Sequence, residues 1–212
     1  MPLIHRIGSD FGLLIWRMEE TTVSLQKFLP EKNYSELEKE FKHPARLRQK
    51  LVVQILLNEM GLATDPHITY LASGQPVPGN FGGYLSISHS KNHVGLMYHP
   101  NHSCGLDLEE PQDRLLRIAD RFLNRVEEEW IRAATRLHDL CLVWSAKEAV
   151  FKAMGGGGII FKEQLAVEAP VRSEDGSGTC QVMFSDKDRR KLFEIHYKYL
   201  DGVMLVHTIA TE

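Results

Sequence analysis

Hydrophobic positions along the chain follow two periods, one helical and one strand-like, and the changes between them mark the predicted elements. In the first half, residues 12–18 predict a strand, and helical periods follow over 23–29, 35–41 and 45–60. In the third helix Leu51, Ile55 and Leu56 have the spacing of a buried face, and Gly61 marks its end. Short strands are predicted at 67–72, 84–88, 94–98 and 104–109.

The second half repeats this order of helices followed by strands. Leu115, Ile118 and Phe122 share one helix face, Asn124 can cap a further helix, and residues 140–154 have the strongest helical pattern. Strands are predicted around 165–168, 181–184, 193–199 and 204–209. Helices followed by strands, twice, predict an α+β protein of two similar halves, which we place at residues 1–102 and 103–212.

Composition and charge narrow the class of protein. Hydrophobic residues make up 43% and charged residues 25%, and the formal net charge is −3, so no bulk attraction to nucleic acid or to an anionic membrane is expected. The three cysteines are scattered, which indicates a reducing compartment. The N-terminal residues lack a signal-peptide pattern, and no run approaches the roughly 20 apolar residues of a membrane span. We therefore expect a cytoplasmic protein.

Residues 105–110, G-L-D-L-E-E, combine a strand pattern with acidic side chains. Because alternate side chains of a strand share a face, Asp107 and Glu109 point the same way, and Leu106 and Leu108 point into the core. Two adjacent carboxylates repel each other unless a cation or a proton lies between them. Taken alone, this pair is more typical of a solvated strand face than of a site.

Residues 144–155, W-S-A-K-E-A-V-F-K-A-M-G, lie on the strongest predicted helix. Trp144, Glu148 and Lys152 are spaced i, i+4, i+8 and form one stripe, which alone indicates a helix-supporting ion pair beside a core tryptophan. Together with the acidic strand, however, the three carboxylates Asp107, Glu109 and Glu148 are a suitable set for one hard cation. Mg²⁺ takes one or two protein carboxylates and completes its shell with water and substrate phosphate, which Lys152 would also meet.

The two segments resemble the paired signature of the Sfp (surfactin-activating) type of 4′-phosphopantetheinyl transferase, G-[IV]-D-[IVL]-E and W-[ST]-x-K-E-[AS]-x-x-K. The matching positions are Gly105, Asp107, Glu109, Trp144, Ser145, Lys147, Glu148, Ala149 and Lys152. Residues 85–90, L-S-I-S-H-S, are similar to the S-x-S-H-S segment of that family, and residues 122–127, F-L-N-R-V-E, to its F-[FL]-x-x-x-E segment.

The resemblance implies a fold and a reaction. The fold would be two similar halves with pseudo-twofold symmetry and the site at their junction. The reaction would be Mg²⁺-dependent transfer of phosphopantetheine from coenzyme A to a serine of an acyl or peptidyl carrier protein, with release of adenosine 3′,5′-bisphosphate. A single chain would then suffice, so we expect a monomer.

The resemblance also implies roles for individual residues. Asp107, Glu109 and Glu148 would hold Mg²⁺ on the pyrophosphate, and Lys152 would neutralise charge on the leaving group. Glu127 is the candidate base for the serine proton; its alternative role is that of an ordinary acid at a helix N-terminus.

Coenzyme A binding is expected to involve Ser88 and His89, and Arg46 and Arg48 are candidates for its 3′-phosphate, with solvated helix-start charges as the alternative. The sequence departs from the family pattern at Gln75, where a basic residue is common, and at Gln54, where the early helix often has arginine. Both departures concern coenzyme A binding and leave the metal site intact.

Two further patterns have simpler explanations. His89, His93, His99, His102 and Cys104 lie close together in sequence, but strand alternation scatters their side chains, so we do not expect a zinc site. Arg114, Arg117, Arg121 and Arg125 follow one helix face; this arrangement fits either a solvated surface or a docking stripe for an acidic carrier protein.

Two other functions fit parts of the sequence. A Mg²⁺-dependent phosphodiesterase or nuclease would use the same carboxylates, but the net charge of −3 gives no overall attraction to nucleic acid, and the serine–histidine segment favours the transferase. A non-catalytic binder of coenzyme A or carrier protein is the second alternative, which the departures at Gln75 and Gln54 leave open.

Overall fold

The computed structural model describes residues 3–7, 11–187 and 189–211. The first half consists of β1 (Leu3–Ile7), β2 (Gly12–Arg17), α1 (Thr22–Gln26), α2 (Glu31–Glu40), α3 (Pro44–Met60), β3 (Ile68–Tyr70), β4 (Pro76–Pro78), β5 (Tyr84–His89) and β6 (His93–His99). The second half consists of β7 (Cys104–Glu109), α4 (Asp113–Phe122), α5 (Arg125–Trp130), the 3₁₀ turn η1 (Ala133–Thr135), α6 (Arg136–Ala153), α7 (Phe161–Gln164), β8 (Leu165–Val167), β9 (Val171–Arg172), β10 (Ser177–Asp186), β11 (Arg189–Leu200) and β12 (Val203–Ile209).

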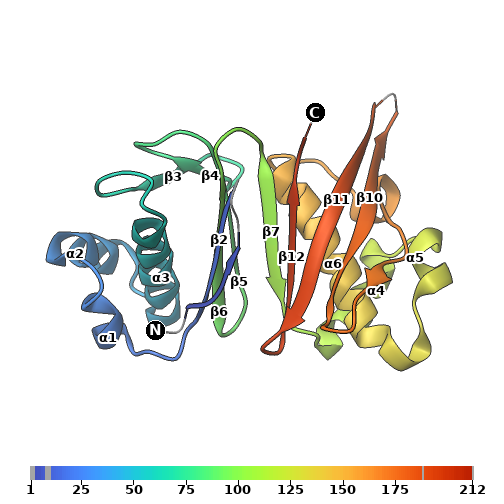
Figure 1. The fold of residues 1–212 in the computed structure, drawn as a ribbon, viewed down its shortest axis with the longest axis horizontal. Helices are drawn as coiled ribbons and strands as arrows, with labels where there is room; N and C mark the ends of the chain where they lie inside the picture. The colour runs from blue at the N-terminus through green and yellow to red at the C-terminus, as the bar shows by residue number, and fades with distance from the viewer. Residues whose placement is uncertain (1–2, 8–10, 188, 212) are drawn as a thin grey trace.

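Each half builds one large antiparallel sheet and covers one face of it with a long helix, and β3 and β4 of the first half pair as a separate two-stranded sheet. The first sheet has the order β1-β2-β6-β5, and the second has β7-β12-β11-β10-β8 with β9 paired to β10. Figure 1 shows the two sheets side by side in the middle of the molecule, with α3 beyond the first sheet and α6 against the second. The cores under these helices include Leu51 and Leu56 in the first half, and Val143 and Val150 in the second.

A third core joins the two sheets. Leu13, Ile15 and Met97 of the first sheet pack with Leu106 and Leu205 of the second. These residues alternate along their strands with those that face the helices, which explains why β2 is buried on both faces. Since a fully buried large side chain contributes roughly 1.5–3 kcal/mol, this core makes the halves depend on each other.

Gly105 permits the close approach of β7 to α6. A Cβ atom at this position would lie 1.8 Å from the carbonyl oxygen of Ala149, a backbone atom that cannot move aside. Any side chain here would push the strand away from the helix, so the glycine fixes the distance between Asp107 on the strand and Glu148 on the helix.

Most of the predicted elements are confirmed, and β7 has the predicted ends at 104 and 109. The helix predicted at 140–154 begins earlier, at Arg136, because polar residues in its first turn interrupt the apolar pattern. The strand predicted at 67–72 is shorter, only Ile68–Tyr70. β1, β4, β9 and α7 were not predicted, since elements of two to five residues show no clear period.

The mixed helix and sheet architecture agrees with the predicted α+β class. The chain passes from one sheet to the other between β6 and β7, in the region where we place the boundary of the halves; separate domains and the pseudo-twofold symmetry stay predictions. Within the described ranges, no helix combines the length and apolar composition that crossing a membrane requires. All three cysteines are buried and unlinked.

Substituting Gly105 by alanine is expected to destabilise the protein by about 3 kcal/mol or more, because overpacking against a backbone atom forces the strand to shift. Urea unfolding of the Gly105→Ala variant measures this loss. The matched control is Gly82→Ala, because a Cβ at Gly82 meets nothing within 4 Å. Equal stability of the two variants would contradict the close-approach explanation.

Candidate active site at the junction of the two sheets

Asp107 is the centre of a hydrogen-bonded group that spans both halves. Its Oδ1 atom lies 2.8 Å from Lys152 Nζ on α6 and accepts a hydrogen bond of 3.0 Å from Ser88 Oγ on β5. The residue is 6% exposed, and its Oδ2 atom is buried without a hydrogen-bond partner among the described residues. An unsatisfied buried carboxylate oxygen is costly, so Oδ2 is a position that a further positive group would stabilise.

Ser86 and Ser88 join the edges of the two sheets. The Oγ atom of Ser88 accepts a hydrogen bond from the backbone amide of Leu108 at 3.1 Å, and that of Ser86 accepts one from the amide of Leu106 at 2.9 Å. Each serine hydroxyl thus satisfies one amide of β7. Ser88 is also 3.2 Å from Lys152 Nζ and only 5% exposed.

These contacts place Ser88 beside the carboxylates. Its hydroxyl binds Leu108, Asp107 and Lys152 and so orients Asp107, and the expected contact to coenzyme A stays a prediction.

Glu148 faces Asp107 from α6, as the helix stripe predicted. Burial, and after it the negative charge of Asp107, raise the pKa of Glu148 to about 7, with Lys152 opposing and Glu109 adding to the shift. The carboxyl groups of Asp107 and Glu109 are therefore close enough to Glu148 for their charges to act on it.

Glu109 is held at the edge of the same group by neighbours from the following turn and α4. Arg114 Nη2 contacts its Oε2 atom, and Gln112 Nε2 donates to its Oε1 atom at 3.0 Å. The Glu109 side chain is 12% exposed.

The donor set suits a hard divalent cation by its chemistry, because it consists of carboxylate oxygens with one buried oxygen unpaired. As the side chains lie, however, no group of three His, Cys, Asp or Glu residues in the described part of the chain could hold a metal ion. Lys152 and Arg114 instead neutralise Asp107 and Glu109.

Positive side chains gather around His89, which is exposed at the end of β5. Desolvation and the charges of Lys152 and Lys50 lower the pKa of His89, Asp107 opposes them, and Arg46 adds a smaller effect in the lowering direction. Arg46 and Lys50 are one turn apart on α3 and therefore share a face. Arg48 lies off that face, and its Nε atom is buried without a hydrogen-bond partner.

Lys50 is the residue that the sequence reasoning missed. Its Nζ atom lies 2.6 Å from the hydroxyl of Tyr70, 4.2 Å from the centre of the Tyr70 ring and 5.2 Å from that of Phe41. The two rings hold the ammonium group in place. The sequence feature that could have pointed to Lys50 is its position four residues after Arg46 on the predicted helix.

Two cavities lie beside these side chains. One, of about 190 Å³, is lined by Gln75, Ser86, Lys152 and Gly155. The other, of about 280 Å³, is lined by His89, Lys91, Glu109 and Arg114, among others. Gln75, the departure from the family pattern, therefore lines the same cavity as Lys152. Gln54, the second departure, donates to the carbonyl oxygen of Pro66 and supports the fold there.

A base role for Glu127 does not fit the structure. Glu127 is 0% exposed, its Oε1 atom lies 2.8 Å from Lys147 Nζ, and its Oε2 atom accepts a hydrogen bond of 2.6 Å from the amide of Asn124. It completes a capping box at the start of α5, which is the alternative that the sequence offered. Lys147, a matching position of the signature, is likewise fully buried and also donates to the carbonyl oxygens of Phe122 and Phe161.

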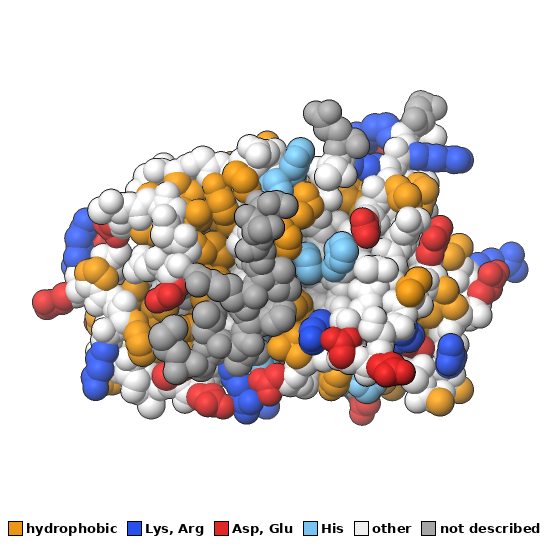
Figure 2. All heavy atoms as spheres, in the orientation of Figure 1, with side chains coloured by type: hydrophobic (Ala, Val, Ile, Leu, Met, Phe, Trp, Pro, Cys, Tyr) orange, Lys and Arg blue, Asp and Glu red, His pale blue; other side chains and the backbone are white. Residues whose placement is uncertain are grey.

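Four other histidines lie apart from the three carboxylates. Figure 2 shows imidazoles in the middle of one face, where a cleft of about 800 Å³ is lined by His99, His102, His196 and His207. His207 pairs with Leu106 and Val206 pairs with Asp107, so this cleft and the carboxylates lie on opposite faces of the sheet. His99 accepts hydrogen bonds from the amides of Asn101 and His102 and shapes the turn before β7.

Replacing Glu127 by glutamine is expected to destabilise the protein by about 3–5 kcal/mol, because it leaves the buried ammonium group of Lys147 without its counter-charge. Thermal or urea unfolding measures the loss. The control is Glu128→Gln, an exposed neighbour on the same helix turn. A Glu127→Gln variant with normal stability and slowed turnover would restore the base role.

Comparison with known proteins identifies a family for part of the chain. Residues 103–201 match the model of the 4′-phosphopantetheinyl transferase superfamily. A search of curated proteins found no match. The matched region contains β7, α6 and all three carboxylates, and it supports transfer of phosphopantetheine as the general activity. Residues 103–201 are therefore a 4′-phosphopantetheinyl transferase superfamily domain.

Proposed function

We propose that the protein transfers the 4′-phosphopantetheine group of coenzyme A to a serine of an acyl or peptidyl carrier protein in a Mg²⁺-dependent reaction. The observation that supports this most is the group of Asp107, Glu109, Glu148 and Lys152 at the junction, inside the superfamily domain. The type of transferase suggested by the signatures, the Sfp type, belongs to this proposal.

The reaction forms a bond between the serine oxygen and the phosphorus next to pantetheine and breaks the bond from that phosphorus to the bridging pyrophosphate oxygen. Adenosine 3′,5′-bisphosphate leaves. Such a transfer needs positioning and charge neutralisation more than covalent help from the protein.

Asp107, Glu109 and Glu148 would hold Mg²⁺, and the unpaired Oδ2 atom of Asp107 is the ligand atom already free to do so. The ion would neutralise pyrophosphate charge. Lys152 would turn from Asp107 to the phosphate, a change that its 26% exposed side chain permits. Because Glu127 is 0% exposed and paired with Lys147, we propose that the serine proton passes to water rather than to Glu127 and ends on the leaving adenosine 3′,5′-bisphosphate or in solvent.

Coenzyme A phosphates would lie against His89, Arg46 and Lys50, whose charges act on one another in the structure. Two of these residues belong to α3 and one to β5, whereas the carboxylates belong to β7 and α6. The site would thus need both halves of one chain, and we propose a monomer as the active form.

The carrier protein would approach along α4. Arg117 and Arg121 are exposed there, and Arg125 follows at the start of α5, next to the half-exposed Leu116 and Val126. A basic surface with apolar side chains fits an acidic helix of a carrier protein. Arg114 is excluded from this surface because it pairs with Glu109.

The function is tested by mass spectrometry of an apo acyl carrier protein incubated with this protein, coenzyme A and Mg²⁺. We expect a mass gain of one phosphopantetheine group, which EDTA abolishes. Glu148→Gln should lower the rate by about 100-fold or more, the order expected when charge stabilisation of a transition state is lost. Glu163→Gln, an exposed glutamate on α7, is the control. No gain on either acyl or peptidyl carriers would contradict the proposal.

Lys50 and Arg48, two basic residues on different faces of α3, give a second test. Lys50→Ala should raise the KM for coenzyme A by about tenfold, the loss of one charged hydrogen bond to phosphate. Arg48→Ala should change that KM by less than about twofold, because Arg48 lies off the face that carries Arg46 and Lys50. Steady-state kinetics with coenzyme A as the varied substrate measures both KM values. A larger increase in KM for Arg48→Ala than for Lys50→Ala would contradict this assignment and place Arg48 in the site instead of Lys50.

A further inference from the structure

The tight turn between β11 and β12 carries an acidic side chain toward the other half. Leu200 pairs with Val203, so Asp201 and Gly202 form a two-residue turn, with φ of 52° and 80°. Asp-Gly suits this geometry because both positions need positive φ. Figure 1 shows the turn at the lower end of the second sheet, the end that approaches the lower ends of β2 and β6.

Asp201 binds two residues of the first sheet. Its Oδ1 atom accepts a hydrogen bond of 2.8 Å from Arg17 Nη1, and its Oδ2 atom lies 3.0 Å from His93 Nε2. Arg17 and His93 are directly opposite each other on β2 and β6. The His93 side chain is 5% exposed and that of Asp201 31%, so the contact is largely shielded from water. The hydrogen bond from His93 is the main cause that lowers the pKa of Asp201.

His93 connects this contact to the candidate site through a short turn. The amide of Ser90 donates to the carbonyl oxygen of His93 at 2.9 Å, and Ser90 Oγ lies 3.4 Å from His93 Nδ1. On the β5 side of the turn lie His89, which pairs with Val94, and Ser88. The hairpin that carries Ser88 and His89 therefore contacts the second half along β5, where Ser86 and Ser88 bind β7, and at its turn, where His93 binds Asp201.

The contacts of Ser86 and Ser88 all lie on β5, whereas Asp201 contacts β6 and β2, so it restrains the turn that carries His89 from the other strand of the hairpin. We propose that Asp201 is a positioning residue: through His93 and Arg17 it holds the β5–β6 turn so that His89 stays beside Lys152 and Ser88 stays on Asp107. This inference rests on the proposed function, because it concerns the same site. It adds a residue that touches no substrate and lies outside every signature in the sequence.

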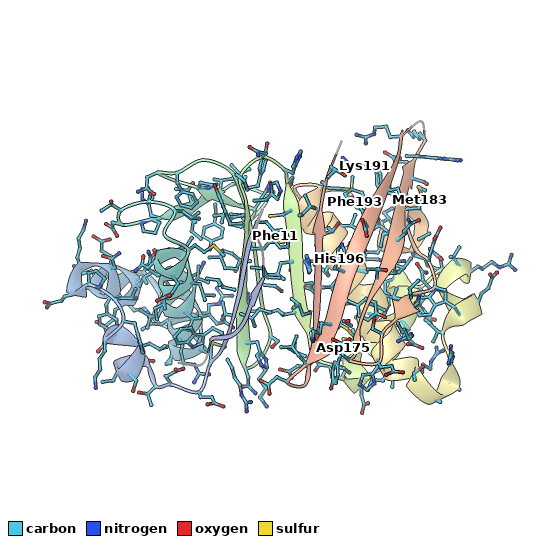
Figure 3. The ribbon with its side chains drawn as sticks, viewed as in Figure 1. Phe11, Asp175, Met183, Lys191, Phe193 and His196 are labelled. Atoms are coloured by element: carbon cyan, nitrogen blue, oxygen red, sulfur yellow. The ribbon has the colours of Figure 1, made fainter. Side chains whose placement is uncertain are left out.

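Asp201→Asn tests the proposal, because an amide cannot accept hydrogen bonds from both Arg17 and His93 through two oxygens. The control is Asp175→Asn. Figure 3 shows Asp175 at the same lower end of the second sheet, where it binds Ser177 and Lys198 within one half. Asp201→Asn should raise the KM for coenzyme A by about tenfold, as expected for a residue that orients a binding group, and leave the KM for the carrier protein within about twofold. Asp175→Asn should change neither.

Hydrogen exchange provides a readout that needs no turnover. In Asp201→Asn the amides of residues 88–93 should exchange faster than in the wild type and in Asp175→Asn, while those of α6 keep their rates. If the wild type shows no transferase activity, this measurement still tests the positioning role of Asp201. Failure of the proposed function and failure of the positioning role can therefore be told apart. Unchanged exchange at 88–93 with an unchanged KM, or faster exchange across the whole chain, would overturn the proposal.

Discussion

The crowding of three carboxyl groups at the junction of the two sheets is the constraint on which the site depends. Asp107, Glu109 and Glu148 cannot all be ionised side by side without positive partners. Lys152 and Arg114 supply two of these partners. Burial, and after it the charge of Asp107, raise the pKa of Glu148 to about 7, so that this carboxyl group tends to keep its proton below that pH. The fold maintains this costly arrangement through Gly105, which brings β7 against α6, and through Ser88, which orients Asp107.

The two halves of the chain contribute different chemical groups to the candidate site. The second half, which contains the superfamily domain, provides the carboxylates and Lys152. The first half provides the serine hydroxyls and the cations around His89, and the third core and Asp201 hold it in position. A phosphate-containing substrate bound between them would meet the positive groups of one half and the metal ligands of the other, which is the reason for placing the site at the junction.

Local sequence patterns predicted the structural features that depend on residues close together in the chain. The alternation in β7 and the stripe on α6 placed Asp107 and Glu148 correctly on facing surfaces, and the Asn124 cap is present. Contacts between distant segments could not be predicted from the sequence. Asp201 and His93, for example, are separated by 108 residues. The acids at 127–129 look alike in sequence, and only burial shows that Glu127 serves Lys147. The contact of Ser88 with β7 could not be predicted from the sequence either, because it joins two different sheets.

Proton release on Mg²⁺ binding tests the central claim most directly. Since the pKa of Glu148 is raised to about 7, this group is mostly protonated at pH 6 and must lose its proton to bind a cation. Calorimetry in buffers of different ionisation enthalpy should therefore show release of nearly one proton per Mg²⁺ at about pH 6 and almost none at about pH 8, with affinity falling as the pH is lowered. Mg²⁺ binding without proton release at pH 6, or no binding at either pH, would contradict the account.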